Sequence, residues 1–161
     1  MLDHIRDLYR HQAWADAEHW ACILAFEPAR VDPALRARLL HIHGAQQLWM
    51  ARWQGLPWTL PEADQFPEIT DILHLAKACG VAFKHHVGAL REEDLGRVLQ
   101  GKRLNGDPYT LSFQDSLIHL AHHSDYHRGQ NATRMRELGS AMTPTGWFDW
   151  VQRDRPGARW D

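Results

Sequence analysis

Four long segments with a helical pattern constrain the fold of this chain more than any other feature. Apolar residues recur in each segment near the helical period, and prolines or glycines lie between the segments. The segments are residues 2–26, 32–54, 69–90 and 112–138. Two connections are long: residues 56–68 hold three prolines, and residues 95–111 contain Asn105-Gly106, which predicts a short hairpin or extended excursion. The sequence therefore predicts an all-α fold, a four-helix bundle with long connections.

Length and composition are those of an ordinary soluble domain. The 161 residues suit a single domain, residues 1–161, with a mobile tail over about residues 151–161. A formal net charge of -2 gives no basic field for nucleic acid, and no apolar run is long enough to cross a membrane. Cys22 and Cys79 stand alone, and there is no secretion leader, so we expect a cytoplasmic protein without disulfides.

Histidine is unusually frequent, with twelve residues in the chain, and three of them share one short stretch. His119, His123 and His127 are spaced four apart, so on a helix they lie one above another on a single face. A pair with this spacing is a simple way for one helix to offer two nitrogens to a metal ion. His123 belongs to either possible pair. His119 could replace His127, act as an acid or base beside the metal, or simply pack.

The second helical segment supplies two candidates for a third ligand. His41 and His43 lie about 200° apart around the helix axis, so one site can use only one of them. Small and apolar residues surround His41, whereas Gln46 and Gln47 indicate a wet face around His43. We therefore expect His41 to point inward and complete the site; the alternative is a core imidazole bonded to a backbone carbonyl. Three imidazoles with an open fourth position are typical of a catalytic metal site.

Other polar residues fall on stripes that are predicted to face inward. On the fourth segment, Tyr126 is a candidate to line a pocket and Arg134 to hold a substrate carboxylate, with packing and a surface position as the alternatives. Together with His119, they are the candidate catalytic residues. On the first segment, Gln12 and Asp16 interrupt the apolar stripe, where polar groups need partners. They line a polar pocket, contact a ligand histidine, or mark the surface end of the stripe.

Three stretches of the chain resemble motifs of a known family. The stretches are His119-x-x-x-His123-x-x-x-His127-Arg128-Gly129-Gln130, Leu40-His41-Ile42-His43-Gly44-Ala45 with Trp49, and Tyr9 with Trp14-Ala15-Asp16. They are similar to the fourth-helix, second-helix and first-helix motifs of the DinB/YfiT-like superfamily of metalloenzymes. This is the damage-inducible DinB family, which is unrelated to the DNA polymerase of that name. The resemblance covers nearly the whole chain.

The resemblance implies a four-helix bundle that holds a divalent metal ion and frequently forms homodimers. By motif position, the implied ligands are His41, His123 and His127. Better characterised relatives are S-transferases or isomerases that depend on a thiol such as bacillithiol, mycothiol or glutathione. This chain departs from the family pattern at three positions, with His122 for Asn, Asp16 for Asn and Gln46 for Glu. None of these departures removes a ligand.

We therefore expect a metal-dependent enzyme with thiol-dependent, S-transferase-like chemistry on a small electrophile. The expected metal cofactor is a divalent ion, zinc or nickel. The thiol-dependent reaction would also use a low-molecular-weight thiol. The alternatives are a hydrolase that uses metal-bound water and a non-catalytic, stress-related metal-binding protein. The expected partners are a small-molecule substrate and a second copy of the chain in a homodimer, with no nucleic acid and no membrane.

Overall fold

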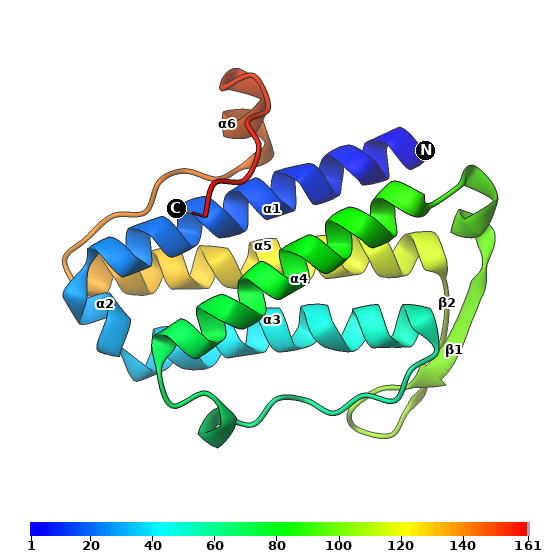
Figure 1. Ribbon diagram of the computed structural model, residues 1–161, viewed down its shortest axis with the longest axis horizontal. Helices are drawn as coiled ribbons and strands as arrows, with labels where there is room; N and C mark the ends of the chain where they lie inside the picture. The colour runs from blue at the N-terminus through cyan, green and yellow to red at the C-terminus, as the bar shows by residue number, and fades with distance from the viewer. Residues whose placement is uncertain (161) are drawn as a thin grey trace.

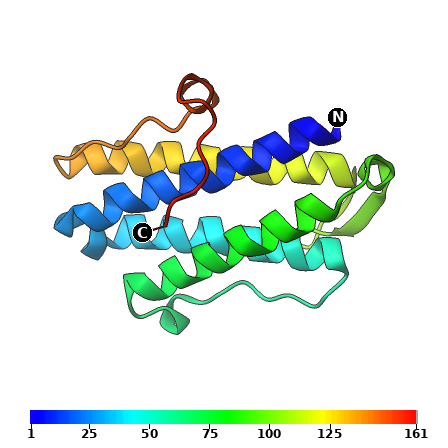
Figure 2. The same ribbon diagram turned by 45° about the horizontal axis from the view of Figure 1, so that its top comes forward.

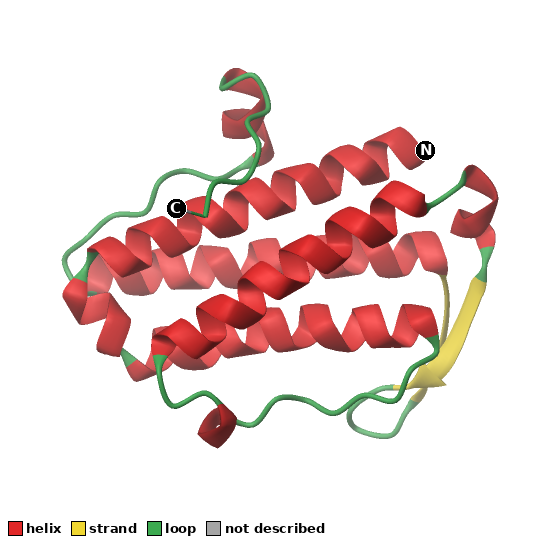
Figure 3. Ribbon diagram, in the orientation of Figure 1, coloured by secondary structure: helices red, strands yellow, loops and turns green. Residues whose placement is uncertain are grey.

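The computed structural model describes residues 1–160 and shows a predominantly helical protein with one small hairpin (Figures 1 and 3). The long helices are α1 (Leu2–Ala25), α3 (Pro33–Gln54), α4 (Ile69–Ala89) and α5 (Phe113–Glu137). The short elements are α2 (Glu27–Val31), η1 (Ala63–Gln65), η2 (Glu92–Gly96), β1 (Val98–Lys102), β2 (Pro108–Ser112) and α6 (Trp147–Gln152). The predicted helical class and the predicted hairpin are both confirmed.

The four long helices lie side by side. Helices α1 and α3 each pack against both α4 and α5, so α1 and α3 face each other across the diagonal of the group. Helices α1 and α5 run in one direction and α3 and α4 in the other (Figures 1 and 2). Because α3 and α4 are parallel, the loop of residues 55–68 must return along the length of the molecule.

The apolar core is divided into two clusters, one toward each end of the long helices. One cluster contains Tyr9, Trp53 and Leu117, and the other contains Trp20, Leu39 and Met135. Between them, at mid-length, α1, α3 and α5 carry buried polar side chains instead of apolar ones. The buried polar residues at this level are Gln12, Asp16, His19, His43, Gln46, Ser124, Arg128 and Asn131. A polar layer therefore crosses the middle of the molecule.

Helix ends follow the local signals in the sequence, with one exception. Asp32 Oδ1 accepts a hydrogen bond from Leu35 N (2.8 Å) at the start of α3, and Ser112 Oγ accepts one from Asp115 N (3.0 Å) at the start of α5. We predicted that a proline after residue 26 ends the first helical segment, but Pro28 does more than this. It lies in the first turn of the separate short helix α2, where its missing N–H does no harm.

The hairpin brings one aromatic side chain close to the end of α3. Strands β1 and β2 pair in antiparallel fashion, with Gly101 directly opposite Tyr109. A Cβ at position 101 would lie 2.7 Å from the Tyr109 hydroxyl oxygen, so glycine is required for the ring to lie across β1. Asn105-Gly106 forms the predicted reversal, with Gly106 at a positive φ of 91°.

The segment after α5 packs on the outside of α1. Trp150 is fully buried and lies with Trp14 and Ala15 of α1, and Arg155 forms an ion pair with Asp7 (2.6 Å). The mobility expected for residues 151–161 stays a prediction, and Asp161 lies outside the described residues. Within residues 1–160, none of the helices has the length and apolar character needed to cross a membrane.

Candidate metal centre

Three histidines come together at the side of the molecule, between α3 and α5. His41 belongs to α3 and is exposed, whereas His123 and His127 belong to α5 and are half-buried. Each offers one ring nitrogen, and the three nitrogens lie within 4.8 Å of one another. The Nε2 atoms of His41 and His123 are 3.1 Å apart. The structure thus brings together the three residues that the sequence predicted as ligands.

The free nitrogens of this cluster fit a divalent metal ion. His127 Nδ1 donates to Gln130 Oε1 (2.8 Å), which leaves the lone pair on Nε2 for a ligand. The Nδ1 of His123 is buried without a partner among the described residues, so Nε2 is also the available nitrogen of that ring. Tetrahedral zinc with bonds of about 2.0–2.1 Å holds its nitrogens about 3.3 Å apart, which is close to the His41–His123 separation.

Burial and neighbouring charges lower the pKa of two histidines of the cluster, His123 and His41. Burial, followed by the charges of His127, His41 and His119, lowers the pKa of His123 to about 4. Burial and then His127 also lower the pKa of His41. A neutral imidazole is the form that binds a metal, so a lowered pKa favours the metal-binding form of His41 and His123.

The cluster offers three histidine nitrogens and has an open side. Among residues 1–160, the group of His, Cys, Asp and Glu side chains placed to share an ion consists of His41, His123 and His127 alone. Because His41 is exposed, small molecules can approach from solvent. Structural zinc sites are normally closed by four protein ligands, so this arrangement is the one expected of a catalytic site.

The long connection passes close to the cluster. Gly44 lies one turn after His41 on α3, and Pro61 of the 55–68 loop packs directly against it. A Cβ at position 44 would lie 2.8 Å from Pro61 Cγ, so a larger residue there would displace the loop or the helix. Glycine at this position lets the loop run within one helical turn of a proposed ligand.

The three candidate catalytic residues have different surroundings. His119 is exposed, and its ring centroid lies 6.2 Å from that of His123 and 5.5 Å from that of Trp49. Tyr126 is 65% exposed and meets the ring of His127 edge-on at 5.1 Å. Both therefore border the cluster on the solvent side.

Arg134 is engaged elsewhere. Its Nε and one terminal nitrogen donate to Asp32 Oδ2 (3.1 and 2.7 Å), and its other terminal nitrogen donates to Glu137 (2.9 Å). Asp32 is the residue that caps α3, so Arg134 ties the end of α5 to the start of α3. Its guanidinium is therefore not free to hold a substrate carboxylate, as we had suggested from its position on the helix.

The predicted orientation of α3 is wrong, although the choice of His41 agrees with the cluster. His43 and Gln46 are each only 1% exposed, whereas His41 lies at the surface. The same error affects α5, whose buried face runs through Leu117, Ser124 and Arg128 rather than through the histidines. Polar residues next to His43 indicated water, but their partners are polar side chains on other helices.

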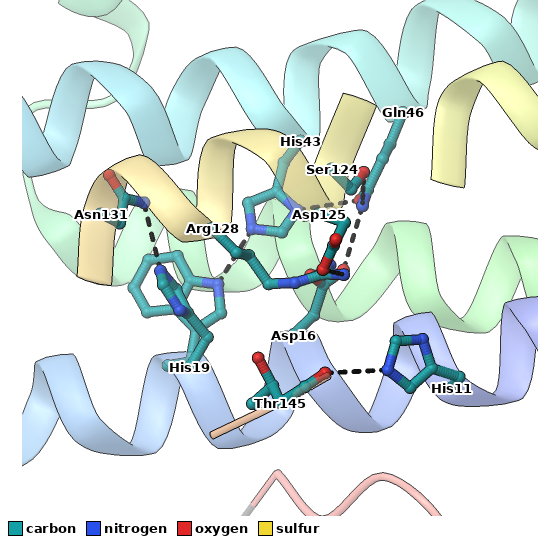
Figure 4. A network of polar contacts seen from close by, with 11 residues as sticks. His11, Asp16, His19, His43, Gln46, Ser124, Asp125, Arg128, Asn131 and Thr145 are labelled. Carbon is teal, nitrogen blue, oxygen red and sulfur yellow. Dashed lines mark hydrogen bonds and ion pairs between the residues drawn. The ribbon is translucent and has the colours of Figure 1, made fainter. Parts of the chain in front are cut away.

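The buried polar layer forms a chain of directed hydrogen bonds (Figure 4). Trp20 Nε1 donates to His43 Nε2 (2.9 Å), so His43 Nδ1 carries the proton and donates to Gln46 Oε1 (2.9 Å). The Gln46 amide then donates to Asp16 Oδ2 (3.0 Å) and to Ser124 Oγ (3.3 Å). Both nitrogens of His43 are therefore occupied, and this ring has no lone pair for a metal.

An ion pair completes the layer. Arg128 donates to Asp16 Oδ1 (2.7 Å), and both side chains are almost completely buried. Burial alone would raise the pKa of Asp16, but the Arg128 charge and the hydrogen bonds from Gln46 and Arg128 outweigh it and leave the pKa below its usual value. Asp16 lies on the otherwise apolar stripe of α1. Its carboxylate is nevertheless paired there, with Gln46 of α3 and Arg128 of α5.

A second buried histidine lies at the edge of the same layer. Asn131 Nδ2 donates to His19 Nε2 (3.2 Å), so that nitrogen must be unprotonated. Burial, followed by the charge of Arg128, lowers the pKa of His19 to about 3. Sequence reasoning missed His19, Arg128 and Asn131. The available signal was a run of polar residues at helical spacing on both α1 and α5.

The layer fixes the helices that carry the proposed ligands. Ser124 directly follows His123, and Arg128 directly follows His127, while Gln46 belongs to the same helix as His41. Hydrogen bonds from these neighbours to one another and to Asp16 hold α1, α3 and α5 at one relative height. The positions of the ligands relative to one another therefore depend on side chains that do not belong to the cluster.

Comparison with known proteins agrees with the geometry. The family model described as DinB family matches residues 1–156, almost the whole chain. None of the curated proteins matches the chain. Together with the three clustered histidines, the match indicates a metal-binding protein.

Proposed function

We propose that this chain, which belongs to the DinB family, is an enzyme that uses a divalent metal ion held by three histidines. The proposed ligands are His41, His123 and His127. We interpret the four long helices as the four-helix bundle that the sequence predicted. The reaction that we propose is transfer of a thiol sulfur to a small electrophile.

One observation carries this proposal: ring nitrogens of three histidines converge and leave one side open to solvent. A closed site would hold an ion for structure alone. Here a small molecule can reach the point where the three nitrogens converge, because His41 lies at the surface and Tyr126 borders the opening.

A divalent ion of the zinc or nickel type, when bound, favours the ionised form of a thiol or water that joins it. The side chains around the opening have complementary tasks. In this proposal a nitrogen of His119, which neighbours His123, takes the proton that the thiol loses. The thiolate sulfur then bonds to the electrophilic carbon of the substrate as the leaving group departs with its electron pair. In this proposal the exposed Tyr126, whose ring meets that of His127, donates a hydrogen bond from its hydroxyl to that leaving group.

The experiment combines metal analysis with a thiol-dependent assay. The purified protein is loaded with zinc or nickel and mixed with a chloronitroaromatic or an epoxide, with and without glutathione, cysteine or bacillithiol. We expect metal in the wild type and thiol-dependent product formation. We expect neither in His123→Ala, whereas His85→Ala, at an exposed position on α4, should match the wild type.

Other outcomes identify the alternatives. Product formation without any thiol would indicate the hydrolase. Bound metal without any turnover would indicate a non-catalytic metal-binding protein, and wild type that takes up no metal would overturn the proposal. The expected homodimer and the cytoplasmic location stay predictions; light scattering on the purified protein tests the first.

A further inference from the structure

A cleft of about 190 Å³ opens between the end of α3 and the hairpin. In Figure 1 the hairpin lies beside the last turn of α3 and leads into the start of α5. Arg52 and Trp58 line the cleft from one side, and Gly101, Lys102 and Tyr109 line it from the hairpin. None of these residues belongs to the histidine cluster or to the buried polar layer.

The Arg52 guanidinium is held in place inside this cleft by aromatic rings. Its central carbon lies 5.0 Å from the centroid of Trp49, 4.7 Å from that of Trp58 and 5.2 Å from that of Tyr109. One terminal nitrogen donates to the carbonyl oxygen of Lys102 (2.8 Å). Such contacts fix the orientation of a guanidinium before a ligand arrives, which lowers the entropy lost on binding.

The positive charge of Arg52 has no counterion in the described part of the chain. Arg128 and Arg134 each pair with a carboxylate, but no carboxylate of residues 1–160 lies within 4.0 Å of the Arg52 nitrogens. Lys102 and Arg103 add further positive charge on the adjacent hairpin. An oriented guanidinium with free N–H groups in a cationic cleft matches a carboxylate, which it can bind through two parallel hydrogen bonds.

The cleft is connected to the histidine cluster by two aromatic rings. Trp49 lies 6.1 Å from Tyr109 and 5.5 Å from His119, measured between ring centroids, and His119 is the neighbour of His123 on α5. A molecule that extends across the Trp49–His119 pair would therefore reach Arg52 with one end and the proposed ligands with the other.

We propose that Arg52 binds a carboxylate of the small molecule that reacts at the histidine cluster. This inference rests on the proposed function and specifies the substrate class: an anionic molecule several bonds longer than its reacting group. The carboxylate belongs either to the thiol or to the electrophile.

A binding experiment tests the site without turnover. The probe is S-methylglutathione, which has two carboxylates and a blocked sulfur, and its dimethyl ester, which keeps the amino group and lacks both carboxylates, is the control. Titrations followed by calorimetry are made with wild type, Arg52→Gln, Arg52→Lys and Arg30→Gln, each with and without zinc. Arg30 is exposed on α2, so its variant controls for the loss of one positive charge.

We expect the acid to bind wild type and Arg30→Gln equally, and the loss of charge-assisted hydrogen bonds to weaken binding roughly tenfold to a hundredfold in Arg52→Gln. The affinity of Arg52→Lys for the acid should lie between those of wild type and Arg52→Gln, because lysine keeps the charge and lacks the planar guanidinium group. Equal binding to wild type and Arg52→Gln would overturn the proposal. So would equal binding of the acid and its ester to wild type, which does not depend on the folding of any variant.

Kinetics then separate the two possible sources of the carboxylate. If it belongs to the thiol, Arg52→Gln raises KM for glutathione and leaves KM for cysteamine, a thiol without a carboxylate, unchanged. If it belongs to the electrophile, KM rises only for an electrophile that carries a carboxylate. Metal content should stay that of wild type in every Arg52 variant. A failed metal site and a failed Arg52 site therefore give different results.

Discussion

His41 and His43 are two residues apart on one helix, but their rings have opposite surroundings. His41 is exposed, and its Nε2 lies 3.1 Å from the Nε2 of His123, a contact in which the ring tautomers decide the donor. His43 is buried, accepts from Trp20 at one nitrogen and donates to Gln46 with the other. The first ring has a lone pair to offer; the second has none.

This difference teaches that the partner helices decide which histidine has a nitrogen free to bind a metal. His43 accepts a hydrogen bond from Trp20, which belongs to α1. His41 instead contacts His123, which belongs to α5. A metal site and a hydrogen-bonded core can therefore lie at one level of the same fold, one on the solvent side and one at the centre.

The largest expected effect comes from removing a histidine of the cluster formed by His41, His123 and His127. His123→Ala should lose the metal ion, with affinity lowered by more than roughly a hundredfold, since a ligand contributes more than an outer partner of a ligand. Metal titration of the purified variant measures this. His43→Ala should keep the metal and lose stability instead. The comparison fails if His43→Ala releases the metal and His123→Ala retains it.

The next largest effect concerns the ion pair of the buried layer. Arg128→Met leaves the Asp16 carboxylate buried without its charge partner, and we expect the free energy of unfolding to fall by about 3 kcal/mol. Urea denaturation of the metal-free protein measures it, with Arg136→Met, at an exposed position on α5, as the control. Asp16→Asn combined with Arg128→Met should recover part of the loss. A change below about 1 kcal/mol would show that the pair contributes little.

Acid should destabilise the buried layer through His19. The folded pKa of His19 is about 3 and the unfolded value about 6.5, so between them the unfolded state binds more protons. The stabilisation is complete above the unfolded value and declines as pH falls, by about 2 kcal/mol at about pH 5. Asp16, His43 and Arg128 face this ring, and burial also lowers the pKa of His43.

Denaturation curves of the metal-free wild type and of His19→Gln, measured between neutral pH and about pH 5, isolate this contribution. The variant should show a shallower loss of stability on acidification. Parallel curves would mean that His19 is not the group responsible.

The smallest expected effect concerns the orientation of one proposed ligand. Gln130→Ala removes the acceptor of His127 Nδ1, so the ring is free to rotate and metal affinity should fall roughly tenfold, or about 1.4 kcal/mol. Competition with a metal chelator measures this. Gln47→Ala, at an exposed position on α3, is the matched control. An unchanged affinity would show that Gln130 does not orient the ring.

Much of the fold could be predicted because its signals are local. Apolar periodicity, the Ser112 cap, Gly139 with its positive φ and the Asn105-Gly106 turn act within a few residues of where they stand. They gave helix ends that agree with the structure to within a residue or so. The short helix α2 was missed because Pro28 is compatible both with the end of one helix and with the start of another.

The candidate site could be predicted only in part, because burial is decided by partners. The spacing of His123 and His127 is visible in the sequence, whereas the burial of His43 depends on Trp20, and that of Gln46 on Asp16, both on a different helix. A polar residue on a helix face indicates water only where no complementary polar stripe exists. Here α1 and α5 provide such stripes.

The proposed ligands come from helices far apart in the sequence, since His41 and His123 are separated by 82 positions. An ion bound to both would act as a cross-link and close a long loop in the unfolded chain. In the loop-entropy treatment used for disulfides, a closure of this length stabilises a fold by about 4.5 kcal/mol. Metal supply would then set the lifetime of the folded protein as well as its activity.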